Sequence, residues 1–209
     1  YQKNKGLDVL LDVLPDILRK HTDVSVEFYG RTVPRHEGWF HKCIAELDCP
    51  DRVSVNSSLD KGNLRERLQS ADLFISASRF EGSPRVVKEA ICAGCPVVLS
   101  SIPGHLGLDS QRKYIHFIDE HEASSWYRGL NVAIEQSDTE WLRRSHTGVE
   151  VMKTHMPDPS IDEDMLTNLD ERINDAKLIL DGLNSLVTTA EEMVKEFAEE
   201  NVVEKTTKP

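Results

Sequence analysis

Hydrophobic and polar positions recur along the first 120 residues with two different periods, which predicts helices and strands in turn. Apolar residues three or four positions apart predict helices, and short alternating or wholly apolar runs predict strands. The predicted helices span 6–21, 36–48, 63–71 and 84–93. The predicted strands span 24–30, 52–56, 72–78, 96–100 and 114–119. Pro15 lies inside the first helix, so we expect a kink or a break near Leu14.

Strands that alternate with helices of this length indicate βαβ units. They predict an α/β fold with a parallel sheet and helices on both of its faces. In such sheets ligands bind beyond the carboxyl ends of the strands. The acidic residue Glu81 follows the strand 72–78 in such a position.

A different pattern begins after MPDPS at 156–160, so we expect a first domain over 1–157 and a helical tail over 158–209. Apolar residues of the tail form a heptad seam of five a/d pairs. The seam residues are Leu166, Leu169, Ile173, Ala176, Leu180, Leu183, Val187, Ala190, Val194 and Phe197. The seam predicts a coiled coil that forms a homo-oligomer through 161–200, or else a helix that lies along the domain.

The charge is concentrated in the tail. The 209 residues carry a formal net charge of -11, and residues 158–209 hold 14 acidic and 5 basic residues. An acidic chain is a poor partner for nucleic acid or an anionic membrane. No apolar run is long enough to span a bilayer. We therefore expect a cytoplasmic protein, and peripheral membrane contact stays open.

Cys92 and Cys95 have the spacing of a zinc or redox motif. No matching pair of His or Cys residues stands at a suitable distance along the chain, so we expect buried thiols and no metal site.

The candidate chemistry lies in EGSPRVVKEAICAGCPVVLS, residues 81–100. Ser83 is a suitable N-cap, Pro84 suits the first helical position, and Gly94 suits a left-handed stop. The free N–H groups near Arg85, Val86 and Val87 would then form an anion site, with diphosphate as the obvious anion.

Glu81 and Glu89 flank this turn, and carboxylates accept paired hydrogen bonds from vicinal diols. A diphosphate between two polyols describes a nucleotide sugar. The alternative interpretation treats both glutamates as solvated charges, with Glu89 paired to Arg85 one helical turn away.

The segment 81–98 closely resembles the E-x7-E signature of retaining family 4 glycosyltransferases, which have the GT-B fold. Lys5, Gly6 and Leu7 resemble the Lys-Gly segment that opens the donor-binding half of these enzymes. The segment 52–78 resembles the run that precedes their first glutamate. The resemblance covers about residues 5 to 120 and implies a Rossmann-like domain that binds a nucleotide sugar.

The resemblance also implies roles for individual residues. Glu89 would hold the ribose hydroxyls, and Glu81, the candidate catalytic residue, would contact the transferred sugar near its anomeric centre. The turn Gly82–Val86, which contains Ser83, Pro84 and Arg85, would hold the diphosphate, with Lys5 neutralising its charge. The substrate would be a UDP- or GDP-sugar, with no cofactor and no metal. The base, the sugar and the acceptor are not readable from the sequence.

The chain departs from the family in two respects. The amino-terminal domain that binds the acceptor lies outside the sequence, and so does the first strand of the donor half, which is central in a sheet of order 3-2-1-4-5-6. We expect this chain to be a fragment of a longer enzyme and to transfer no sugar alone. The alternative is that another element fills the place of the absent strand. Membrane contact through the missing domain also stays open. The alternatives are a GT-B-like epimerase, for which no catalytic His/Asp set is visible, and a non-catalytic scaffold that binds partners through its coiled coil.

Overall fold

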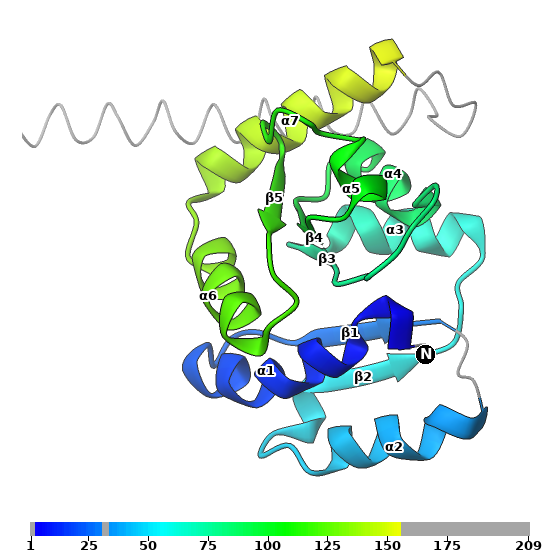
Figure 1. Ribbon diagram of the computed structural model, residues 1–209, viewed down its shortest axis with the longest axis vertical. Helices are drawn as coiled ribbons and strands as arrows, with labels where there is room; N and C mark the ends of the chain where they lie inside the picture. Colours follow the sequence, from blue (N-terminus) through cyan, green and yellow to red (C-terminus); the bar gives the residue numbers. More distant parts are fainter. Residues whose placement is uncertain (1–2, 31–33, 156–209) are drawn as a thin grey trace, which may run out of the picture. The chain divides into compact units, whose positions relative to one another are not determined.

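The computed structural model describes residues 3–30 and 34–155, and each strand and helix expected before residue 120 is present (Figure 1). The strands are β1 (Val26–Tyr29), β2 (Val53–Asn56), β3 (Phe74–Ser76), β4 (Val97–Ser100) and β5 (Ile115–Ile118). The helices are η1 (Lys3–Lys5), α1 (Leu7–Lys20), α2 (Pro34–Ala45), η2 (Pro50–Arg52), α3 (Lys61–Ser70), α4 (Arg85–Cys92), α5 (Pro103–Leu106), α6 (Ala123–Ile134) and α7 (Asp138–His155).

All strand pairs are parallel, as expected for βαβ units. β1 pairs with β2, with Val26 opposite Val53. A second sheet has the order β3-β4-β5. Within residues 3–30 and 34–155, no ladder joins β1 to β3. In a sheet of order 3-2-1-4-5-6, these two groups correspond to the strands on either side of strand 1.

Helix α1 packs into two hydrophobic cores. Val9, Val13 and Ile17 lie in the core that contains Trp126 of α6. Leu11, Leu14 and Leu18 lie in the core that contains the side chains of β1, β2 and α2. The helix continues past Pro15 to Lys20, so the expected break is absent. Burying one aliphatic side chain stabilises by about 1.5–3 kcal/mol, so six of them outweigh the cost of about 3 kcal/mol for an interior proline.

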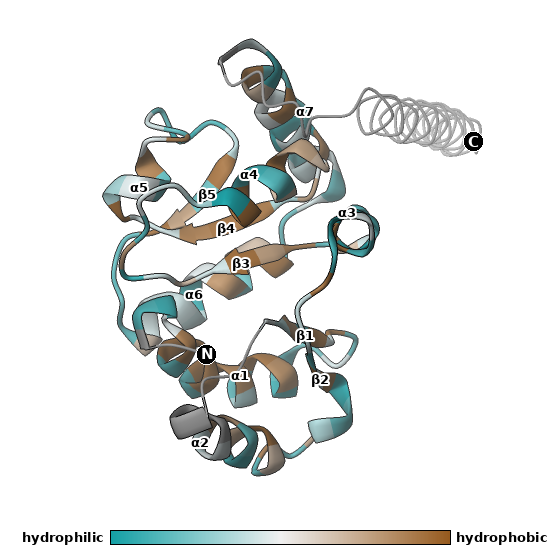
Figure 2. Ribbon diagram, turned by 90° about the vertical axis from the view of Figure 1, so that its right-hand side faces the viewer, coloured by the Kyte–Doolittle hydropathy of each residue, from teal (hydrophilic) through white to brown (hydrophobic). Residues whose placement is uncertain are grey.

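The β3-β4-β5 sheet is covered on both faces. Every residue of β4 is buried. Val97 and Leu99 pack into a core with Val87 and Ile91 of α4, whereas Val98 points into the core shared by α1 and α6. Figure 2 shows β3 and β4 as hydrophobic strands with helices around them. Because both faces of the sheet are filled by apolar side chains, the edge at the carboxyl ends of the strands is where polar side chains can lie.

Helices α6 and α7 are absent from the sequence prediction. Trp126 and Leu130 of α6 and Val149 and Met152 of α7 are buried, and α7 packs against α4. Cys92 and Cys95 are buried as thiols in the core beside α4. In the part of the chain that is described, no helix is long and apolar enough to cross a membrane. The predicted tail over 158–209 lies outside the described residues.

Candidate functional site

An ion pair lies beyond the carboxyl end of β3. Lys5 Nζ is 2.6 Å from Glu81 Oε1, so two of the predicted site residues are in direct contact. Ser78 Oγ donates a second hydrogen bond, 2.8 Å long, to the same oxygen. Glu81 is 18% exposed in its side chain and Lys5 is 47% exposed, so solvent still reaches both groups.

Gly6 explains how Lys5 reaches Glu81. Gly6 has φ of +66°, and a Cβ at this position would lie 1.9 Å from the carbonyl oxygen of Ala77. The Arg79 N–H also donates to the Asn4 carbonyl at 2.8 Å. The chain before α1 therefore lies directly against the chain after β3, which only glycine permits at this position.

A second glycine fixes the backbone of Glu81 itself. A Cβ on Gly104, in α5 after β4, would lie 2.1 Å from the Glu81 carbonyl oxygen. The loops after β3 and β4 are thus in van der Waals contact at Glu81. Gly104 was not among the site residues predicted from the sequence.

Three buried polar side chains lie behind Glu81: Ser78 and Ser100, each 1% exposed, and His105, 0% exposed. Ser100 Oγ donates to the Ser78 carbonyl. His105 Nδ1 is 2.9 Å from the Ser100 carbonyl, so Nδ1 carries the proton and Nε2 is an acceptor. Within the described residues Nε2 has no hydrogen-bond partner. His105 was not among the site residues predicted from the sequence.

The electrostatics of the site keep Glu81 ionised. Burial acts to raise the pKa of Glu81, but the hydrogen bonds from Lys5 and Ser78 outweigh it and leave the pKa below the usual carboxyl range. Burial lowers the pKa of His105, and the hydrogen bond to the Ser100 carbonyl and the charge of Glu81 only partly oppose this effect. At neutral pH the site therefore holds a carboxylate beside a neutral imidazole.

The turn before α4 differs from the sequence prediction in detail. Pro84, with ψ of 84°, is the N-cap rather than the first helical residue, and no side chain caps the helix. Ser83 is therefore not the N-cap, and its Oγ lies 3.4 Å from Lys88 Nζ. Because the first N–H groups of a helix lack intrahelical partners, those of Arg85, Val86 and Val87 are available at this end. Gly94 has the predicted left-handed φ of 72°.

Most residues of the turn before α4 are accessible. Gly82, Ser83, Arg85 and Val86 are exposed, and Pro84 is buried. Glu89 is half-buried one helical turn after Arg85. Among the described residues Arg85 and Glu89 make no ion pair, so the alternative of an ordinary surface pair is not what the structure has.

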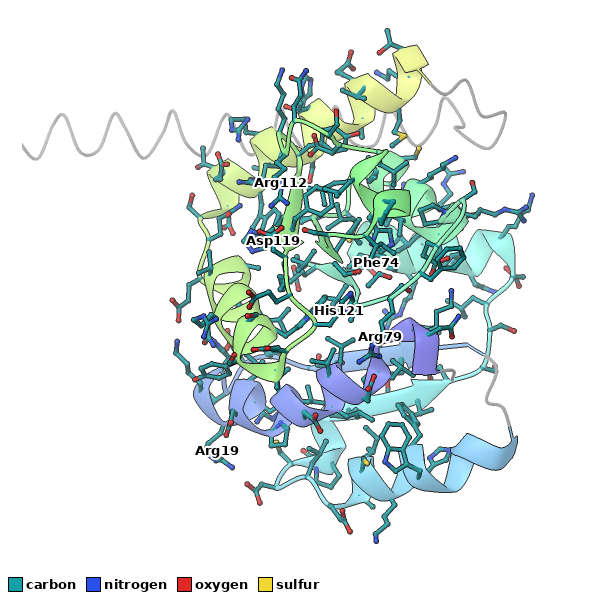
Figure 3. All side chains as sticks on the ribbon, in the orientation of Figure 1. Arg19, Phe74, Arg79, Arg112, Asp119 and His121 are labelled. Carbon is teal, nitrogen blue, oxygen red and sulfur yellow. The ribbon has the colours of Figure 1, made fainter. Side chains whose placement is uncertain are left out.

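A further ion pair connects α1 to the loop after β3. Arg79 Nη1 and Nη2 donate to the two carboxylate oxygens of Asp8 at 2.6 and 2.9 Å. Figure 3 shows Arg79 near His121 of the loop after β5, and the charge of Arg79 contributes to lowering the pKa of His121, after burial. Asp8 and Arg79 are 71 residues apart, so the pattern of residues along the chain does not predict this pair.

Comparison with known proteins supports the sequence resemblance. A family model described as "Glycosyl transferases group 1" matches residues 1–142. A GDP-mannose:cellobiosyl-diphosphopolyprenol alpha-mannosyltransferase from Xanthomonas oryzae pv. oryzae is 33% identical over 108 residues, which are 52% of this chain and 28% of that enzyme. A glycogen synthase from Anaeromyxobacter dehalogenans is 38% identical over 80 residues, 38% of this chain and 16% of the synthase. The chain thus spans less than a third of either relative.

Solved structures share the fold. The C-terminal domain of the group 1 family glycosyl transferase LpcC from Francisella tularensis has a TM-score of 0.65 at 15% identity, over 74% of this chain and 81% of that one. Anabaena HepE, solved in complex with UDP-glucose, has a TM-score of 0.67 at 18% identity, over 82% of this chain and 46% of HepE. The expected α/β fold is therefore confirmed. With the family model matching well over half of its residues, the chain belongs to the group 1 glycosyltransferases.

Proposed function

We propose that this chain carries the donor-binding half of a retaining family 4 glycosyltransferase, which moves a sugar from a nucleoside diphosphate to an acceptor. The observation that carries the proposal is the Lys5–Glu81 ion pair at the carboxyl end of β3. Glu81 lies in the loop that leads to the amino-terminal end of α4, which no side chain caps. The spacing from Glu81 to Glu89 is that of the E-x7-E signature.

The roles of the residues follow from their charges. The N–H groups of Arg85, Val86 and Val87 and the ammonium of Lys5 would stabilise the diphosphate, which carries the leaving-group charge. The half-buried Glu89 would accept hydrogen bonds from the ribose diol. We propose that these groups need no metal or other cofactor. An ammonium and a helix amino terminus already place positive charge where negative charge develops on the leaving diphosphate.

Glu81 would act as a hydrogen-bond acceptor for the transferred sugar. Its lowered pKa means that it carries no proton to donate at neutral pH. The hydrogen bond from the buried Ser78 hydroxyl also stabilises the negative charge of the carboxylate, which makes it a weaker nucleophile. We therefore assign Glu81 to orientation of the sugar and to electrostatic stabilisation near the anomeric carbon.

Two relatives point to the class of donor. HepE was solved with UDP-glucose, and the name of the Xanthomonas enzyme specifies GDP-mannose. A nucleoside diphosphate joined to a hexose is common to both. We propose that this chain binds a UDP- or GDP-sugar and that the acceptor is bound by a part of the enzyme outside this sequence, so that the 209 residues alone do not transfer sugar.

Isothermal titration calorimetry with UDP-glucose and GDP-mannose, in the presence of EDTA, tests the proposal. The wild-type chain should bind one of the two. Replacing Glu89→Gln removes a charge-assisted acceptor worth about 1.5–3 kcal/mol, so Kd should rise about 10- to 100-fold. Glu150→Gln is the matched control on the exposed side of α7, and it should leave Kd within about twofold, as expected for a surface pair.

Three outcomes would contradict parts of the proposal. A wild-type chain that binds neither donor would favour a non-catalytic module that kept the fold. Binding that is lost in EDTA and restored by a divalent metal would refute metal independence. Robust sugar transfer by the purified chain would refute the division into donor and acceptor halves.

A further inference from the structure

The two hydrogen bonds to Glu81 reach the same oxygen. Lys5 Nζ and Ser78 Oγ both donate to Oε1, at 2.6 and 2.8 Å. Within the described residues Oε2 accepts no hydrogen bond. One oxygen of the carboxylate is thus used internally, and the other keeps its full capacity to accept hydrogen bonds from a ligand.

The two donors differ in how firmly they are held. Lys5 is a flexible point charge, 47% exposed, that can follow a nearby anion. Ser78 is 1% exposed, and its carbonyl accepts from Ser100 Oγ. A lysine that turns toward a phosphate loosens its hold on Glu81, whereas Ser78 stays in place.

The surroundings of Ser78 keep its hydroxyl directed toward Glu81. Ser76 Oγ donates to Ser78 Oγ at 3.3 Å, so the Ser78 proton is left for Glu81 Oε1. Ser100 is the last residue of β4, and its hydroxyl holds the Ser78 backbone by donating to the Ser78 carbonyl. The Ser100 carbonyl in turn accepts a hydrogen bond from His105. The contacts come from three separate segments: the end of β3 with the residues after it, the end of β4, and helix α5.

We propose that Ser78 is a positioning residue that fixes the rotamer of Glu81, so that Oε2 faces the transferred sugar of the donor. Lys5 supplies positive charge. Ser78 keeps the Glu81 carboxylate in its orientation, also when Lys5 contacts the diphosphate. This inference rests on the proposed function, because it assigns the sugar to Glu81. It makes Ser78 important for the sugar part of the donor and unimportant for the nucleoside diphosphate.

The test compares a nucleotide sugar with its own nucleotide. Calorimetry gives Kd of the 209-residue chain for UDP-glucose and UDP, and for GDP-mannose and GDP. Replacing Ser78→Ala should weaken binding of the preferred nucleotide sugar about 5- to 30-fold and leave Kd for the free nucleotide within about twofold. Ser145→Ala is the matched control, because Ser145 is also buried but its Oγ has no hydrogen-bond partner among the described residues.

A second measurement needs no ligand. A carboxyl carbon-13 NMR titration of Glu81 should show a higher pKa in Ser78→Ala than in wild type, because one of the hydrogen bonds that lower the pKa is gone. A purely structural role of Ser78 would not move this titration. If Ser78→Ala fails to fold, Ser78→Cys keeps a weak donor of similar size and should give intermediate values.

The outcomes separate the two proposals. If wild type binds neither nucleotide nor nucleotide sugar, the proposed function fails and this inference fails with it. If wild type binds a donor but Ser78→Ala weakens sugar and free nucleotide equally, or neither, only the positioning role is overturned. An unchanged pKa of Glu81 in Ser78→Ala would also overturn it.

Discussion

Replacing Gly6→Ala should destabilise the domain and separate Lys5 from Glu81. At φ of +66° an alanine loses roughly 1–2 kcal/mol relative to its preferred conformation. Its Cβ would also lie 1.9 Å from the Ala77 carbonyl oxygen, and such overpacking costs about 1–3 kcal/mol once the backbone has moved. The free energy of unfolding should therefore fall by about 2–5 kcal/mol, a large share of the roughly 5–15 kcal/mol of a typical domain.

Urea denaturation followed by far-ultraviolet circular dichroism measures this change. The matched control is Gly38→Ala, because Gly38 lies inside α2 and an added Cβ meets nothing within 4 Å. That substitution should stabilise by about 0.5–1 kcal/mol, since alanine is the better helix former. The two glycine substitutions thus have opposite expected signs. A loss below about 1 kcal/mol in Gly6→Ala would refute the close approach of the two segments at this position.

Substitutions at two other positions test contacts that hold the loops. The Asp8–Arg79 pair is bidentate and half-buried, so Asp8→Asn should lower the free energy of unfolding by about 1 kcal/mol at pH 7. Although burial acts to raise it, the pKa of Asp8 is lowered in the folded state by Arg79, so its stabilisation is present at neutral pH and is lost as the pH falls below about 4. Urea denaturation from pH 7 to pH 3 should therefore show the Asp8→Asn and wild-type curves converging, and a constant difference would contradict this. Asp109 is 4% exposed, and its carboxylate accepts hydrogen bonds from the backbone N–H groups of Lys113, Tyr114 and Ile115. Asp109→Ala should therefore lower the free energy of unfolding in urea by about 2–5 kcal/mol. Asp109→Asn keeps one oxygen and should lower it clearly less.

The sequence predicted the elements before residue 120 well because their apolar positions have a clear period. The run 97–100 is wholly apolar up to its last serine, and it forms the fully buried strand β4. The apolar residues of 7–18 have helical spacing, and the helix continues through Pro15 because they are buried on two sides. Helix α7 was missed, and its apolar residues are interrupted by charged and polar ones such as Arg143, Arg144 and His146.

The candidate site was predicted in part. The resemblance brought Lys5 and Glu81 to one site, and the structure adds that they are paired with each other. The roles of Ser78 and His105 depend on the register of β3 against β4, which sequence periodicity does not give. The start of α4 was misplaced by one residue, because the fixed φ of Pro84 suits a helix but its ψ of 84° does not.

Helix α1 has a mechanical consequence for the site. It begins directly after Lys5 and Gly6, its first turn carries Asp8, and its body is anchored in two separate cores. Because α1 packs on the layer formed by β1, β2 and α2, we expect a shift of that layer to move the start of α1 and with it Lys5. We therefore expect substitutions at Phe28 or Phe40, which lie in that layer, to change the position of the Lys5 charge relative to Glu81.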